Sequence, residues 1–140
     1  MMGNPAFSII IPVKAINDYV RETVEHILGL DDPDWELMIV PNDPTVSEWS
    51  DPRIQLMASG RVGPGAKRDM AAKVAKGDFL VFLDDDSYPK NNLFTVARPW
   101  MHHPQVAALG GPAITPPEDG FLQQVSGAVF LSRCSGGSPE

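Results

Sequence analysis

The 140-residue sequence is short of cysteine, of positive charge and of long apolar runs, and each shortage excludes a class of protein. Its one cysteine, Cys134, cannot form an internal disulfide, which excludes a disulfide-stapled fold. Eleven basic residues against 18 acidic ones give a net charge of −7, which argues against long-range electrostatic binding to nucleic acid. No apolar run approaches the roughly 18 residues of a membrane helix, and residues 1–6 lack the basic start of a signal peptide. We therefore expect a cytoplasmic chain with no membrane span and no nucleic-acid partner, although a full-length form could still associate with a membrane.

The composition is otherwise that of a soluble globular protein. Apolar residues make up 43% and charged residues 21% of the chain, and the length fits one domain. Fourteen prolines and twelve glycines require frequent turns. Residues 126–140 show no clear periodicity and are expected to form an irregular tail. We expect a single domain over residues 1–140 that is truncated at its C-terminus.

Apolar segments alternate with amphipathic ones along the chain. The strand candidates are continuous apolar runs, which is typical of a parallel sheet with both faces covered. Helix candidates carry an N-terminal signal (Asn17, Pro64) and a glycine just beyond the end (Gly29, Gly77). The order favours an α/β domain with a mostly parallel sheet flanked by helices. The expected strands are 7–13, 35–40, 53–57, 78–83 and 106–109, and the expected helices are 18–28, 64–76 and 91–102, the last interrupted or ended near Pro99.

Polar residues follow three of the expected strands, at residues 12–14, 41–43 and 84–86. In open α/β sheets, ligands bind at the carboxyl ends of the strands. These three segments are therefore the first places to look for a site.

The third segment is a run of three carboxylates, Asp84, Asp85 and Asp86, directly after the apolar run FLVFL. Adjacent carboxylates repel one another unless a cation neutralises them, and such hard oxygen ligands suit Mg²⁺ or Mn²⁺. In an extended segment, Asp84 and Asp86 face the same side and Asp85 is turned aside. The alternative is a solvated acidic turn.

A glycine-led basic segment, residues 63–69, opens the second expected helix. Free N–H groups at a helix start attract anions, and Lys67 or Arg68 would reinforce that attraction. The segment is neither a P-loop nor a spaced G-x-G-x-x-G, and the alternative is a plain helix start with solvated basic residues. After the second strand, Asn42 or Asp43 could contact a nucleobase or a ribose hydroxyl, or simply form a turn.

The segments SIIIPV, ELMIV, GPGAKRDMAAKVAKGDF and FLDDD, in this order, resemble the family 2 inverting glycosyltransferases. The resemblance covers residues 7–111 and is most specific over residues 63–86. It implies the GT-A fold, a Rossmann-like, mostly parallel sheet flanked by helices, here as an incomplete domain. The chain departs from the family where Val13-Lys14-Ala15 replaces a tyrosine and asparagine, and where residues 41–44 replace D-D-G-S.

The same resemblance implies roles for individual residues. Asp84 and Asp86 match the two aspartates of the D-x-D motif, so that Asp86 would hold a divalent metal, Mn²⁺ or Mg²⁺, on the donor diphosphate. Asp84 would contact the ribose or the metal. The implied nucleotide-binding set is Pro12, Val13, Asn42, Asp43, Lys67, Arg68, Asp84 and Asp85, with either Asn42 or Asp43 reading the base.

The expected reaction is transfer of a sugar from a nucleotide-diphospho donor, UDP-linked, to the hydroxyl of an unknown glycan, lipid or small-molecule acceptor. Inverting transfer needs a general base. We expect that base beyond Glu140, with Glu118 and Asp119 as lesser candidates, so the chain could bind donor without turnover. Two alternatives stay open: a phosphohydrolase or phosphotransferase with an aspartate nucleophile, and a non-catalytic nucleotide-binding module.

Overall fold

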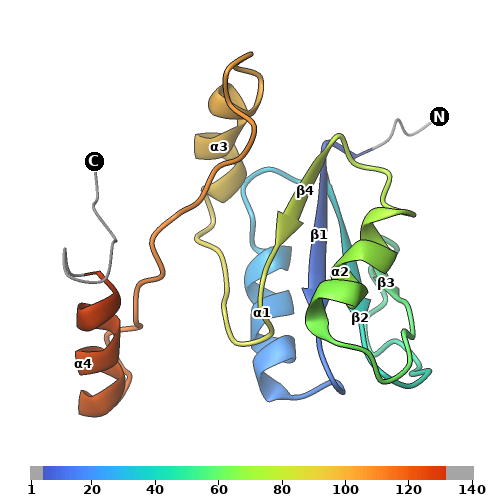
Figure 1. Ribbon diagram of the computed structural model, residues 1–140, viewed down its shortest axis with the longest axis horizontal. Coiled ribbons are helices and arrows are strands. Elements are labelled where there is room, and N and C mark those ends of the chain that lie inside the picture. Colours follow the sequence, from blue (N-terminus) through green and yellow to red (C-terminus); the bar gives the residue numbers. More distant parts are fainter. Residues whose placement is uncertain (1–4, 132–140) are drawn as a thin grey trace. The chain divides into compact units, whose positions relative to one another are not determined.

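A four-stranded parallel sheet forms the centre of the first part of the chain (Figure 1). The computed structural model describes residues 5–131. The chain divides into two compact units, residues 1–103 and 104–140, and the sheet belongs to the first. Its strands, in the spatial order β3-β2-β1-β4, are β1 (Phe7–Pro12), β2 (Trp35–Val40), β3 (Ile54–Leu56) and β4 (Phe79–Phe82). The α/β class and the parallel sheet are thus confirmed.

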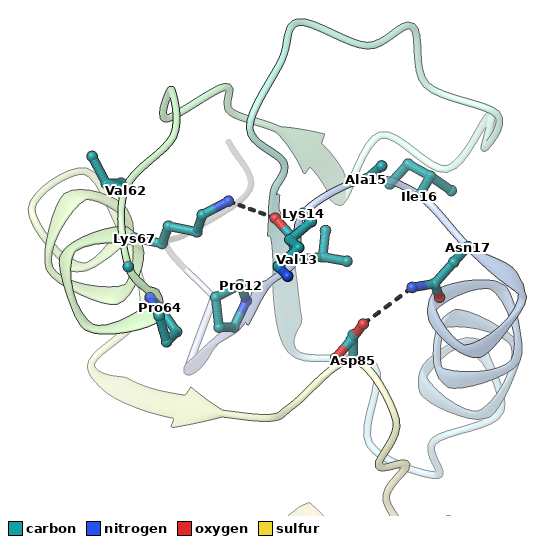
Figure 2. A pocket seen from close by; sticks show the side chains of 11 residues that line it. Pro12, Val13, Lys14, Ala15, Ile16, Asn17, Val62, Pro64, Lys67 and Asp85 are labelled. Atoms are coloured by element: carbon teal, nitrogen blue, oxygen red, sulfur yellow. Dashed lines mark hydrogen bonds between the residues drawn. The ribbon is translucent and has the colours of Figure 1, made fainter.

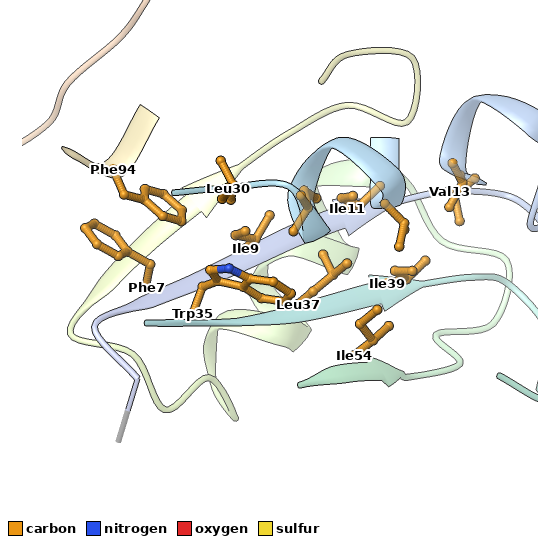
Figure 3. Packing of buried hydrophobic residues seen from close by; sticks show 13 residues of the cluster. Phe7, Ile9, Ile11, Val13, Leu30, Trp35, Leu37, Ile39, Ile54 and Phe94 are labelled. Carbon is orange, nitrogen blue, oxygen red and sulfur yellow. The ribbon is translucent and has the colours of Figure 1, made fainter. Parts of the chain in front are cut away.

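Helices cover both faces of this sheet. Alternate residues of β1 point to opposite faces: Ile9 and Ile11 enter one core cluster and Ile10 enters another. The first cluster packs under α1 (Asp18–Leu28) and receives Phe94 of α3 (Leu93–Met101), as Figure 3 shows. The second includes Ala71 of α2 (Pro64–Ala72). Because β1 and β2 are buried along their whole length, their carboxyl ends are held rigidly.

Helix α1 begins and ends where the sequence predicts. The Asn17 side-chain oxygen accepts a hydrogen bond from the Val20 N–H group (2.9 Å), and Gly29 is the C-cap. Val20, Val24 and Ile27 are buried at helical spacing against the sheet. The cap therefore starts the helix at the edge of the sheet where the strands β1 and β4 end.

We expect Asn17→Ala to lower the free energy of unfolding by about 1 kcal/mol, since it removes the N-cap acceptor. Chemical denaturation of the two proteins measures the difference. Asn17→Ser is the matched control, because serine keeps a capping oxygen and should recover most of the stability. An alanine variant as stable as the parent chain would show that the cap contributes nothing.

Helix α2 ends at Ala72, four residues before the predicted end. The backbone N–H groups of Lys76 and Gly77 do not continue the helix but donate to side chains of the sheet, to Glu36 Oε1 (2.6 Å) and Ser8 Oγ (2.8 Å). The Ser8 hydroxyl also donates to Glu36 Oε1 (2.7 Å), and both side chains are buried. This polar cluster fixes the turn between α2 and β4.

The second unit, residues 104–140, departs most from the sequence predictions. No strand forms at residues 106–109, because an isolated four-residue apolar run is stable only when it pairs with another strand. Residues 126–130 are not an irregular tail but belong to α4 (Phe121–Phe130). Cys134 and Glu140 lie outside the described residues. A single domain over the whole chain stays a prediction. Within residues 5–131, no helix has the length and apolarity that crossing a bilayer requires.

Candidate functional site

A pocket of about 640 Å³ lies at the carboxyl ends of β1 and β4 (Figure 2). Its wall consists of residues 12–17, from the last residue of β1 onward, residues 62–64, which lead into α2, and Lys67 and Asp85. The predicted residues Pro12, Val13, Lys67 and Asp85 are therefore brought together. The pocket has this position because the parallel strands end at the same edge of the sheet, where the loops after them meet the start of α2.

Lys67 is the most enclosed charged group of the site, with 3% of the residue exposed. Its ammonium donates to the carbonyl oxygens of Val13 (2.5 Å) and Val40 (3.1 Å) and to Asn42 Oδ1 (2.7 Å). Burial lowers the pKa of Lys67 from its ordinary value, and the charge of Asp43 acts in the opposite direction. Lys67 thus joins the end of β1 to the end of β2. Its direct contact with a nucleotide stays a prediction.

Asn42 and Asp43 lie beside the pocket rather than in its lining. The Asn42 backbone N–H group donates to the Lys14 carbonyl (3.0 Å), and its carbonyl accepts from the Gly60 N–H group (2.9 Å). Asn42 is half-buried, whereas Asp43 is exposed. Asn42 is therefore anchored to the loops on both sides of it.

The acidic run after β4 forms a turn. The strand ends at Phe82, and the Ser87 N–H group donates to the Asp84 carbonyl (3.2 Å). The Asp85 carboxylate reaches the pocket and accepts a hydrogen bond from Asn17 Nδ2 (3.1 Å). The neighbouring Asp84 carboxylate instead contacts Arg68 of α2, so Asp84 and Asp85 point to different helices. That Asp84 and Asp86 face the same side stays a prediction.

Arg68 of α2 forms an ion pair with Asp84, which follows the end of β4. The guanidinium donates to Asp84 Oδ1 (2.6 Å), with the two side chains 30% and 66% exposed. Arg68 Nε is buried and has no hydrogen-bond partner in residues 5–131. The basic helix and the aspartate run are therefore adjacent in space, as their order in the sequence predicts.

The aspartates offer part of a metal site. Asp86 is exposed and makes no hydrogen bond or ion pair within the described part of the chain. In residues 5–131, no three His, Cys, Asp or Glu side chains gather where they could enclose a metal ion. Carboxylates of Asp84 and Asp86 fit a hard cation such as Mg²⁺ or Mn²⁺, provided that phosphate oxygens and water supply its other ligands. The metal assignment stays a prediction.

Glu118 and Asp119 belong to the second unit, residues 104–140. Glu118 is exposed, and the Asp119 N–H group closes a turn with the Pro116 carbonyl (3.1 Å). Their candidacy as the general base stays a prediction, and a base beyond Glu140 lies outside the described residues.

A second hollow of about 470 Å³ lies on the first unit, between Leu28 and residues 48–52. Its carboxylates are already paired, Glu48 with Arg21 (2.8 Å) and Asp51 with Arg53 (2.7 Å). Both carboxylates of this hollow are therefore neutralised by an arginine.

The sequence did not indicate one polar pocket residue, Asn17, as part of the site. Asn17 was recognisable only as a helix cap. Asn17 and Asp85 are 68 residues apart in the sequence, and no local sequence pattern predicts a contact over that distance. Lys14, which belongs to the strand-end segment 12–14 that the sequence indicates, lies in the wall of the pocket.

Comparison with known proteins identifies the family. Residues 8–136 match the sequence model of Glycosyl transferase family 2. The chain belongs to this family. The match spans both the pocket residues and the acidic turn, so the site lies within the family region. It favours the glycosyltransferase interpretation over a phosphohydrolase.

Two relatives show how much of a longer protein the chain resembles. The O-antigen biosynthesis protein RfbC of Myxococcus xanthus is 28% identical over 150 residues, which is 96% of this chain and 11% of that protein. The UDP-Glc:alpha-D-GlcNAc-diphosphoundecaprenol beta-1,3-glucosyltransferase WfgD of Escherichia coli is 31% identical over 92 residues, 61% of this chain and 36% of that enzyme. The family 2 chain therefore spans well under half the length of these relatives.

Solved structures share the fold. S. aureus TarS 1–349 in complex with UDP-GlcNAc matches 68% of the chain and 30% of its own length, with a TM-score of 0.58 and 24% identity. The mannosyltransferase PcManGT of Pyrobaculum calidifontis, in complex with GDP-Man and Mn²⁺, matches 78% of the chain and 36% of its own length, with a TM-score of 0.63 and 21% identity. The GT-A type of fold is thus confirmed.

Proposed function

We propose that this chain is the donor-binding part of a metal-dependent inverting glycosyltransferase. The pocket at the strand ends would take the nucleotide of a nucleotide-diphospho sugar, with UDP as the expected nucleotide. The observation that carries the proposal is the Arg68–Asp84 ion pair, formed by the chain neighbours of the pocket residues Lys67 and Asp85 in a family 2 chain. Structures of the same fold hold UDP-GlcNAc or GDP-Man.

The roles follow from position and charge. Residues 12–17 form a mostly apolar wall that suits the face of a base, whereas Asn42 and Asp43 supply polar groups beside it. Arg68 carries the positive charge that a diphosphate attracts, and its side chain is 30% exposed. Asp85, whose carboxylate is held by Asn17, would accept a hydrogen bond from a ribose hydroxyl.

Asp84 and Asp86 would hold the divalent cation, whose positive charge stabilises the departing diphosphate. The general base that takes the acceptor's hydroxyl proton would come from outside residues 5–131. Glycans, lipids and small molecules are the acceptor classes we consider. We further propose a cytoplasmic location and no nucleic-acid partner. On these assignments the isolated chain binds donor nucleotide without transferring sugar.

Thermal unfolding of the chain with UDP, GDP or dTDP, each with and without Mn²⁺, tests the proposal. A ligand at about 100 times its Kd stabilises the folded state by roughly 2.7 kcal/mol, which gives a clear rise in Tm. We expect such a rise with one nucleotide and only in the presence of Mn²⁺. No rise with any nucleotide at millimolar concentration would contradict a donor site in this chain.

Arg68→Ala should weaken nucleotide diphosphate binding by about tenfold, since a charge-assisted hydrogen bond contributes roughly 1.5 kcal/mol or more. Isothermal titration calorimetry with UDP and Mn²⁺ measures the change. Lys73→Ala is the control, because Lys73 is an exposed cation directly after the same helix. Equal losses of UDP affinity in both variants would show that Arg68 acts only through the general surface charge.

A further inference from the structure

The bonding of Lys67 fixes the orientation of a neighbouring side chain. An ammonium group has three N–H donors and no acceptor. All three find oxygen atoms, on Val13, Val40 and Asn42. The two carbonyl oxygens belong to the ends of adjacent strands, β1 and β2, so Lys67 ties together the two strand ends beside the pocket.

The third bond determines which end of the Asn42 carboxamide is free. The oxygen and nitrogen of an amide are often assigned only from their partners. Here the partner can only donate, so Asn42 Oδ1 must face Lys67. The Asn42 Nδ2 group makes no hydrogen bond within residues 5–131. Asn42 therefore has two N–H donors to offer and its acceptor is already used.

We propose that Lys67 is a positioning residue of the donor site, which turns the Asn42 carboxamide so that its N–H₂ group donates to a carbonyl oxygen of the donor's base. The inference rests on the proposed function, because it assumes that the base lies beside residues 12–17. Asn42 is bonded through its backbone to Lys14, whose side chain lines the pocket. Lys67 itself lines the same pocket, so one cation borders the ligand space and orients the base reader.

The choice between Asn42 and Asp43 follows from the same contacts. Asp43 is exposed and makes no side-chain hydrogen bond with the described residues, so nothing holds its carboxylate in one direction. Asn42 is held at its N–H group, its carbonyl and its side-chain oxygen. A fixed donor discriminates between bases better than a freely rotating acceptor does, because no ordering entropy is lost on binding.

Two variants and two ligands test this inference. Asn42→Asp keeps an oxygen for Lys67 but has no N–H group, and Lys67→Met keeps the length of the side chain but removes the donor. Isothermal titration calorimetry with Mn²⁺ present compares UDP with inorganic pyrophosphate, which has the phosphates and no base. Lys73→Met, at an exposed position, is the matched control.

We expect Asn42→Asp and Lys67→Met each to lower UDP affinity about tenfold and to change pyrophosphate affinity less than twofold. Because Lys67 acts through Asn42, Lys67→Met should cost much less in an Asn42→Ala background. If Lys67→Met does not fold, Asn42→Asp decides alone, since its ion pair with Lys67 preserves the strand-end contact.

Three results would overturn the inference. Unchanged UDP affinity in Asn42→Asp would show that no Asn42 N–H group contacts the base. Equal losses of UDP and pyrophosphate affinity would show a general loss of structure or an added repulsion of the phosphates. Additive losses of UDP affinity in the double variant would show that Lys67 does not act through Asn42. If the parent chain bound pyrophosphate as tightly as it binds any nucleotide, the proposed function would fail as well.

Discussion

Asp86→Asn is expected to abolish the Mn²⁺-dependent part of nucleotide binding while the ligand-free chain stays folded. Asp86 is exposed and has no partner in the described part of the chain, so its removal breaks no contact of the fold. It would, however, remove one of the two carboxylates that the metal needs. An amide is a far weaker ligand for a hard cation, so a loss of roughly 100-fold in UDP affinity is expected with Mn²⁺ present.

Titration calorimetry of UDP with and without Mn²⁺ separates the metal effect from folding. Asp78→Asn is the matched control, because Asp78 is an exposed aspartate just before β4, at the opposite end of the strand from Asp86. The Tm of ligand-free Asp86→Asn should equal or slightly exceed that of the parent chain, since one of three adjacent like charges is gone. If its UDP affinity rose with Mn²⁺ as much as that of the parent chain, Asp86 would not be a metal ligand.

Gly77→Ala is expected to lower the free energy of unfolding by about 3 kcal/mol, the upper range for overpacking a filled interior. A Cβ atom at Gly77 would lie 2.6 Å from the Ser8 backbone nitrogen and 2.7 Å from Ser8 Oγ. Ser8 cannot give way, because it lies in the central strand β1 and is fully buried. The same methyl group would also break a hydrogen bond, because it would push the Ser8 hydroxyl away from the Gly77 N–H group that donates to it.

Urea denaturation measures this difference. Gly65→Ala is the control, because a Cβ atom at Gly65 meets nothing within 4 Å and alanine favours the first turn of α2. That control should be neutral or slightly stabilising. A Gly77→Ala protein as stable as the control would mean that the turn between α2 and β4 is loosely packed.

The sequence predicts the elements of the first unit well because their signals are local. The run WELMIV is apolar throughout and becomes β2 with the same bounds, and Asn17 and Gly29 delimit α1 by capping. The end of α2 is predicted four residues late, because Ser8 and Glu36, far away in sequence, take the N–H groups of Lys76 and Gly77.

The second unit is predicted poorly for a related reason. Helix α4 has no capping side chain at Gly120 and no charged residue, so it carries few helix signals. Gly127 inside it favours the prediction of a loop. At residues 106–109, the apolar run indicates a strand, but a strand also needs a partner that the pattern does not supply.

At the site, the sequence predicts which strand ends are involved and that Arg68 lies near the aspartates. It does not predict the directions of the side chains. A lysine after a glycine-rich turn is normally solvated, and the burial of Lys67 arises only when the ends of β1 and β2 provide three oxygen atoms. The contact of Asp85 with Asn17, 68 residues away, likewise depends on the tertiary fold rather than on any local pattern.

The most direct test of a donor site at the strand ends is amide chemical-shift mapping of the ¹⁵N-labelled chain during titration with UDP and Mg²⁺. We expect the largest shifts in residues 12–17, 62–68 and 84–87, the segments that form the pocket and the acidic turn beside it. Shifts confined to residues 48–52 around the second hollow, or to α4, would place the nucleotide elsewhere and contradict a donor site in this pocket.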